Sequence, residues 1–133
     1  MDVRIETSLS GLNASAKALS AAANNIANAQ TAGSLEDAAD APYTPVEVKT
    51  TAQGEGQGVT ARTVKQDLPF VPFYNPDSPF ANKDGYFGLP YVNLDEQLIN
   101  AKTAQNNYEA NAAVLKTGIE LSDTLLNAVD KSA

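Results

Sequence analysis

The spacing of apolar residues at the two ends of the chain limits the fold more than any other feature. Within residues 3–28, and again within 93–131, apolar residues or alanines recur at alternating intervals of four and three. This spacing predicts two helices, each with one apolar side, as in left-handed coiled coils. The second helix would be about 55 Å long. We therefore predict a mainly α fold in which the terminal helices pack antiparallel, as a coiled-coil-like pair.

The two predicted helices are expected to meet along these regularly spaced positions. Asn93 precedes the second helix and can cap its N-terminus, with Glu96 at the third helical position as in a capping box. The predicted intrachain contact residues are Ile5, Leu9, Leu12, Leu19 and Ile26 on the first helix, and Leu98, Tyr108, Leu115, Ile119 and Leu126 on the second.

Between the helices lies a segment of different composition, which holds all seven prolines of the chain. Its first half contains two alternating runs, residues 46–50 and 59–64, on either side of a glycine-rich stretch. This pattern predicts a β-hairpin. We expect one subunit built from three segments: 1–33 with the first helix, 34–91 with the hairpin and an arm, and 92–133 with the second helix.

The second half of the middle segment, residues 68–91, is rich in proline and aromatic residues and contains an Asp84-Gly85 turn. We expect an ordered but irregular extended arm here. The loop Ser34 to Ala41 is acidic, with Glu36, Asp37 and Asp40 clustered among alanine and serine residues. We interpret it as a solvated loop.

The first helix carries almost no charge. Between Thr7 and Gln30 the only charged residue is Lys17, whereas a surface helix ordinarily carries charge on its outward face. In so short a chain, other subunits are expected to cover this face, with Ala14, Ala21 and Asn25 in the contact. The alternative is an ordinary helical hairpin whose polar residues face water.

Catalytic chemistry has little support in this sequence. Cysteine and histidine are both absent, which removes disulfides, Cys/His zinc sites and Ser-His-Asp triads. A hydrolase of the glycosidase kind would rest on the number of carboxylates alone. The net charge of −7 argues against a nucleic-acid partner. We predict no enzyme activity, no cofactor, no metal and no small-molecule substrate.

Membrane insertion is also not expected. No stretch is apolar and long enough to span a bilayer. Residues 1–6 have neither the basic n-region nor the apolar h-region of a cleaved signal peptide. Export, if it occurs, is expected to proceed without such a peptide.

Several short motifs resemble the signatures of the flagellar rod and hook proteins, a family of axial structural proteins. One set lies on the first helix and one on the second, and the arm resembles rod proteins of the FlgC type. The motifs are Ser10-Gly11-Leu12-Asn13-Ala14, Ala23-Asn24-Asn25-Ile26-Ala27-Asn28-Ala29 with Thr31 and Gly33, Asn107-Tyr108-Glu109-Ala110-Asn111 with Val114 and Thr117, Tyr74-Asn75-Pro76, Asn82 to Tyr86, and Leu89 to Asn93.

This resemblance implies a structural subunit of the proximal rod in the periplasmic part of the basal body. It implies export by the flagellar type III apparatus, and helical assembly with other rod proteins and further copies of the chain to transmit torque. The alternative is a soluble helical adaptor or type III secreted protein that acts as a monomer or dimer. With the resemblance, the expected subunit-interface residues are Ala14, Ala21, Asn24, Asn25, Asn28, Glu109 and Asn111.

Overall fold

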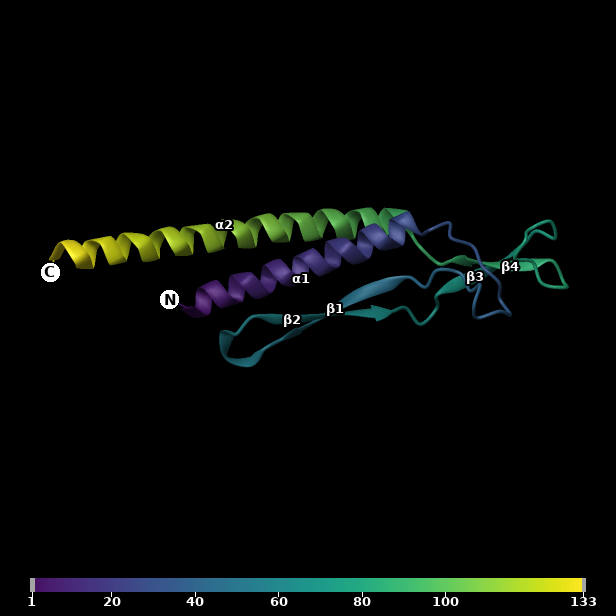
Figure 1. Cartoon of the computed structure of the whole chain (residues 1–133), viewed down its shortest axis with the longest axis horizontal. Coiled ribbons are helices and arrows are strands. Elements are labelled where there is room, and N and C mark those ends of the chain that lie inside the picture. The colour runs from purple at the N-terminus through teal and green to yellow at the C-terminus, as the bar shows by residue number, and fades with distance from the viewer. Residues whose placement is uncertain (1, 133) are drawn as a thin grey trace.

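The computed structural model describes residues 2–132 of the chain, with side chains for residues 5–131. One helix precedes the two β-hairpins in the sequence and the other helix follows them, and the molecule is elongated (Figure 1). The β1–β2 hairpin lies along α1, and the β3–β4 hairpin lies at the end where α1 finishes and α2 starts. The elements are α1 (Asp2–Ala27), β1 (Val46–Ala52), a 3-10 turn (Gly54–Gly56), β2 (Val59–Lys65), β3 (Phe70–Tyr74), β4 (Tyr86–Pro90) and α2 (Leu94–Ser132).

The two predicted helices are confirmed, and they run antiparallel. Asn25 of α1 bonds Gln97 near the start of α2, Gly11 lies against Asn111, and Ile5 lies against Gly118. The helices contain 26 and 39 residues, about half of the chain. The fold is therefore half helical rather than mainly α, because both halves of the middle segment form hairpins.

The predicted N-terminal cap of α2 is present. The Asn93 side-chain oxygen accepts a hydrogen bond from the Glu96 backbone N–H at 3.2 Å, and the Asn93 carbonyl accepts the first helical bond from Gln97 at 3.0 Å. The cap satisfies one of the free N–H groups at the start of a helix. It also fixes where α2 leaves the β3–β4 hairpin.

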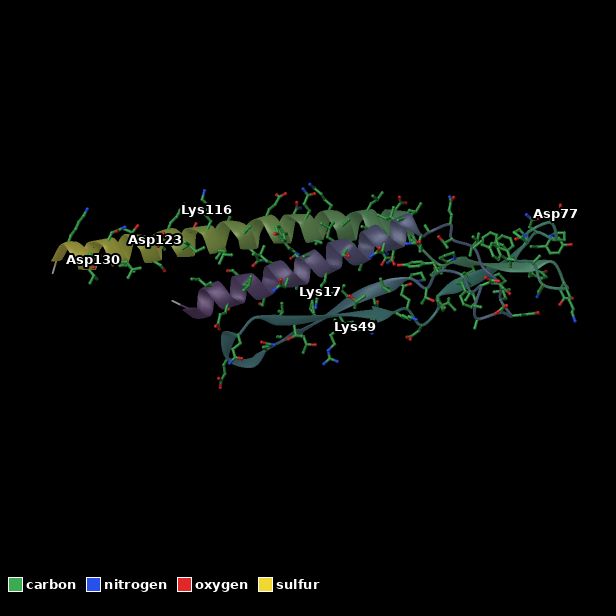
Figure 2. All side chains as sticks on the ribbon, in the orientation of Figure 1. Lys17, Lys49, Asp77, Lys116, Asp123 and Asp130 are labelled. Carbon is green, nitrogen blue, oxygen red and sulfur yellow. The ribbon has the colours of Figure 1, made fainter. Side chains whose placement is uncertain are left out.

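The first predicted hairpin is confirmed as an antiparallel pair, with Val46 opposite Lys65 and Ala52 opposite Val59. The alternation that predicted it separates two faces. Val48 and Ala61 lie on the face toward α1, and Ala61 is 7% exposed. The opposite face carries charge, and Figure 2 shows Lys49 pointing away from the helices.

The expectation of an irregular arm is wrong, because residues 70–74 and 86–90 form a second antiparallel hairpin. Proline usually prevents central strand pairing since it has no N–H. Here Pro72 lies opposite Gly88, and the Gly88 N–H and carbonyl are bonded to Gly33 instead. Pro72 therefore occupies a position where the ladder needs no donor from it.

Two cross-strand aromatic pairs support the β3–β4 hairpin. The ring centroids of Phe73 and Phe87 are 6.4 Å apart, and those of Tyr74 and Tyr86 are 5.3 Å apart in an edge-on arrangement. Such pairs contribute about 0.5–1.5 kcal/mol each beyond area burial. The aromatic residues thus stabilise a strand pairing that the prolines obscured in the sequence.

Candidate subunit interface

Two sides of α1 are covered by the chain itself. α2 packs on one side of it and the β1–β2 hairpin on another (Figure 1). Polar contacts attach the hairpin along the helix. The Thr7 hydroxyl donates to the Gly56 carbonyl at 2.7 Å, the Val59 N–H donates to the Ser10 hydroxyl at 3.1 Å, and the Lys17 ammonium donates to the Ala61 carbonyl at 2.9 Å.

The near absence of charge is explained inside the subunit for the two sides of α1 that the hairpin and α2 cover, whereas Asn13, Ala16, Ser20 and Ala23 remain exposed and uncharged. Lys17, the one charged residue between Thr7 and Gln30, is bonded to the hairpin (Figure 2). Small neutral residues allow the hairpin and α2 to approach α1 closely, without the cost of desolvating ions. The inference that other subunits must cover this helix is wrong for these two sides of it.

Asn25 joins three parts of the molecule. Its side-chain nitrogen donates to the Val46 carbonyl at 2.7 Å and to the Gln97 side-chain oxygen at 2.9 Å. Its side-chain oxygen accepts from the Val46 N–H at 2.9 Å and from the Tyr43 hydroxyl at 3.0 Å. Asn25 is 1% exposed. All the hydrogen-bonding positions of the amide are used, so α1, β1 and α2 meet at this one residue.

Tyr43 completes this amide cluster from the loop that precedes β1. Burial raises the pKa of the Tyr43 hydroxyl above its ordinary value, which keeps the group neutral and able to donate. No buried side-chain nitrogen or oxygen atom of the described residues lacks a hydrogen-bond partner. The cluster is therefore fully satisfied, which is the condition under which a buried polar network stabilises a fold.

The buried contact between α1 and its neighbours is made of small and amide side chains rather than large aliphatic ones. The large aliphatic residue among its buried members is Leu12, at 9% exposed. An ideal Cβ on Gly11 would lie 2.6 Å from the Asn111 side-chain oxygen, so the two helices approach closely at this point. The other buried residues of the two helices are Ser8, Ala14, Ser15, Ala21, Ala22, Asn25, Gln97 and Ala104.

A groove of about 380 Å³ remains between α1, α2 and β1. Ala14, Ala18, Ala21 and Ala22 of α1 line it at helical spacing. The opposite walls are formed by Val46, Val48 and Thr50 of β1 and by Gln97, Asn100, Thr103, Ala104 and Asn107 of α2. The hairpin thus covers α1 without filling the space beside it.

α2 continues beyond the start of α1. Gly118 lies beside Ile5, and α1 begins at Asp2, so the last turns of α2 extend past it (Figure 1). We call residues 119–132 the overhang. Its large aliphatic side chains are exposed, with Leu121 at 54%, Leu125 at 50% and Leu126 at 67%. Clusters of exposed aliphatic residues are typical of interaction surfaces.

Comparison with known proteins identifies the family. A family described as flagella basal body rod protein matches residues 5–33, and one described as flagellar basal body rod FlgEFG protein C-terminal matches residues 85–128. The flagellar basal-body rod protein FlgC of Salmonella typhimurium is 31% identical over 113 residues, covering 81% of this chain and 82% of the relative. The chain belongs to the FlgC family of flagellar basal-body rod proteins.

Other FlgC proteins are similar to this chain as well. The FlgC protein of Escherichia coli O6:H1 is 31% identical over 113 residues, again with 81% of this chain and 82% of the relative covered. The FlgC protein of Borreliella burgdorferi is 36% identical over 69 residues, 48% of this chain and 45% of the relative. The family matches contain both helical partners of the amide cluster, Asn25 in the first and Gln97 in the second.

The predicted intrachain contact residues are largely misplaced. Leu12 is buried, and Ile5, Ile26 and Leu115 are half-buried. The remaining six are 40–67% exposed, so they do not form the buried contact between the helices. The physical reason is that, apart from Leu12, α1 turns small and amide side chains toward α2 and the hairpin, and leaves Leu9 and Leu19 exposed. These six are Leu9, Leu19, Leu98, Tyr108, Ile119 and Leu126.

Three predicted subunit-interface residues are buried within the single chain, and two of them, Ala14 and Ala21, line the groove. Ala14, Ala21 and Asn25 are buried at 8%, 6% and 1% exposed, because they face the hairpin, the groove and α2. The Asn111 side chain fills the space at Gly11. Asn24, Asn28 and Glu109 are not buried, so they stay available for a subunit contact.

Sequence reasoning missed the amide partner Gln97 and the exposed residues Leu121 and Leu125. The sequence contained a signal for Gln97. It stands four residues before Ala101 and seven before Ala104, which is again the spacing of one helix face, but shifted by one residue from the predicted Leu98. The described residues contain no group of three acidic, histidine or cysteine side chains suited to a metal ion. Within residues 2–132, no helix meets the length and hydropathy needed to cross a membrane.

Proposed function

We propose that the chain is a structural subunit of the flagellar basal-body rod and that it assembles with other rod proteins and with copies of itself. The observation that carries this proposal is the 31% identity to FlgC rod proteins over 81% of the chain. The two family matches, over residues 5–33 and 85–128, lie on the terminal helices, which form the candidate interface. A structural role requires surfaces for neighbouring subunits rather than a catalytic centre.

The geometry supports this role. The molecule is elongated (Figure 1), and the overhang exposes Leu121, Leu125 and Leu126 at one end of it. An exposed aliphatic surface on a helix is costly for an isolated subunit and favourable when a neighbour removes it from water. Asn24, Asn28 and Glu109 remain candidates for polar contacts at such an interface.

Membership of the FlgC family supports a more specific proposal. We propose further that the subunit belongs to the proximal rod, in the periplasmic part of the basal body, where helical packing of its helices with neighbours would transmit torque. Delivery there would use the flagellar type III export apparatus without a cleaved signal peptide. The role is structural and non-enzymatic.

A complementation experiment tests the proposed function. Cells that lack the gene for this chain should be non-motile and should lack complete rods, and the intact gene should restore both. A tagged copy should then be recovered in purified basal bodies. A motile deletion strain with complete basal bodies, or a tagged chain found only outside them, would contradict the proposal.

A further inference from the structure

We propose that the leucines of the overhang of one copy of this chain insert into the α1–α2–β1 groove of a second copy. This inference rests on the proposed function and goes further by assigning the two surfaces that meet. One surface is a helix face with large exposed side chains. The other is a concave groove that the chain itself leaves unfilled, with alanines of α1 along one wall and mostly amide and hydroxyl side chains on the α2 wall.

The apolar side of the overhang continues the side of α2 that α1 covers. Leu125 stands seven residues after Gly118 and fourteen after Asn111, and both of these residues contact α1. Residues seven apart share a helix face to within about 20°. In this structure α1 leaves Leu125 uncovered (Figure 1), and the α1 of another copy is a suitable cover for it.

The charged residues in the overhang and just before it permit this contact. Lys116 and Glu120 form an exposed ion pair at 3.8 Å, and Asp123 and Asn127 follow at spacings of three and four on the same side of the helix. This polar side faces away from the side that carries Leu125. Docking through the leucines would leave these charges in water, and so would avoid the cost of burying an ion.

The groove fits a pair of aliphatic side chains on a helix. Its alanine floor from Ala14 to Ala21 runs about 10 Å along α1, and Leu121 and Leu125 are about 6 Å apart along α2. Its volume of about 380 Å³ is at the lower end for ligand-sized cavities. The only charged lining residues are Glu47 and Glu96, which favour a neutral aliphatic occupant over an anionic one.

The two surfaces lie on different parts of one chain, and this has a consequence for assembly. A contact between unlike surfaces of identical subunits is heterologous, and it repeats from copy to copy rather than closing as a twofold dimer. In such an arrangement the overhang of each copy would bind the groove of one neighbour, and the groove of the same copy would bind the overhang of another. Such a contact is suited to a helical array.

Cysteine crosslinking tests the contact, since the chain contains no cysteine of its own. The double variant Ala18→Cys with Leu125→Cys places one thiol in the groove and one on the overhang. Ala18 lies in the groove beside Ala104, and Leu125 is about 30 Å farther along α2. A disulfide requires Cα atoms within about 7 Å, so any bond must join two chains.

Basal bodies isolated from cells that express this double variant, then mildly oxidised, should contain covalent dimers and higher multiples. The matched control, Ala18→Cys with Asn127→Cys, places the second thiol on the polar side of the same turn and should give several-fold less. Thr103→Cys, on the α2 wall of the groove, replaces Ala18→Cys as a second variant with the same expected result.

Three results would overturn the inference while the proposed function stands. They are assembled rods without the crosslink in either groove variant, equal crosslinking in the Asn127→Cys control, and equally abundant dimers from Leu125→Cys alone, which would indicate pairing of two overhangs. Absence of the wild-type chain from basal bodies would instead contradict the proposed function, and the inference would fall with it.

Discussion

The two parts of α2 differ in what they expose and in what covers them. From Leu94 to Gly118 the helix lies beside α1, and the side chains it buries there are small or amide groups such as Gln97 and Ala104. In the overhang the helix has no α1 beside it and exposes large aliphatic residues, with Leu126 at 67%. One continuous helix thus serves the fold of the subunit in its first part and, in our proposal, a neighbour in its last turns.

This difference shows that side-chain size alone does not identify the core of the subunit. Close approach of the helices requires small residues, and Gly11 leaves the room that the Asn111 side chain occupies. Hydrogen bonds at Asn25 then fix the relative positions of α1, β1 and α2. Aliphatic residues that do not enter this contact remain available to other subunits.

The largest effect is expected at the amide cluster of the covered part. Asn25→Ala removes four hydrogen bonds and leaves partners on Val46, Tyr43 and Gln97 unsatisfied, so it should lower the free energy of unfolding by about 2–4 kcal/mol. The control Asn24→Ala changes an exposed residue and should alter it by less than about 0.5 kcal/mol. Denaturant unfolding of the purified chain measures both, and equal losses would contradict the role of the cluster.

Two helical glycines should respond with opposite signs. A Cβ at Gly11 would lie 2.6 Å from the Asn111 side chain, whereas one at Gly118 would lie 3.7 Å from Ile5, an ordinary contact. Gly11→Ala should therefore destabilise the chain by about 1–2 kcal/mol, and Gly118→Ala should stabilise it by about 0.5–1 kcal/mol through helix propensity. Thermal unfolding would show the two shifts, and stabilisation by both would mean that the helices are not in close contact at Gly11.

The smallest effect is expected for two leucines of α2, one in the part beside α1 and one in the overhang. Leu115 is half-buried beside α1, and Leu125 is 50% exposed. Leu115→Ala should lower the free energy of unfolding of the monomer by about 1 kcal/mol, less than the cost at a fully buried site. Leu125→Ala should change it by less than about 0.5 kcal/mol. If Leu125→Ala were the more damaging substitution in dilute solution, the overhang would belong to the core of the subunit.

The elements that follow a strong periodicity could be predicted from the sequence. The helices and the β1–β2 hairpin appear near their predicted positions because four-three spacing and strict alternation are direct consequences of helix and strand geometry. The β3–β4 hairpin was not predicted, because its strands contain Pro72 and Pro90. Only the register shows that Pro72 stands opposite a glycine that bonds elsewhere.

The faces of the helices could not be predicted by the same reasoning. Leucines such as Leu9 and Leu98 repeat at the spacing of a buried contact, yet they are exposed. Alanine and asparagine carry a weak hydrophobic signal, so a contact built from Ala21 and Asn25 resembles an outward face. Which stripe is buried depends on the hairpin that returns along α1, and helix periodicity does not contain this information.

Hydrogen exchange along α2 in the dilute, monomeric chain tests the central comparison most directly. Amides from Gln97 to Gly118 should be protected by packing against α1, while those of the overhang should exchange much faster, since an unpacked helix end is marginally stable in water. The boundary should fall near Gly118, where Ile5 makes its contact. Equal protection along the whole helix as far as Asp130, or fast exchange from Gln97 onward, would contradict the division of α2 into a folded part and an exposed overhang.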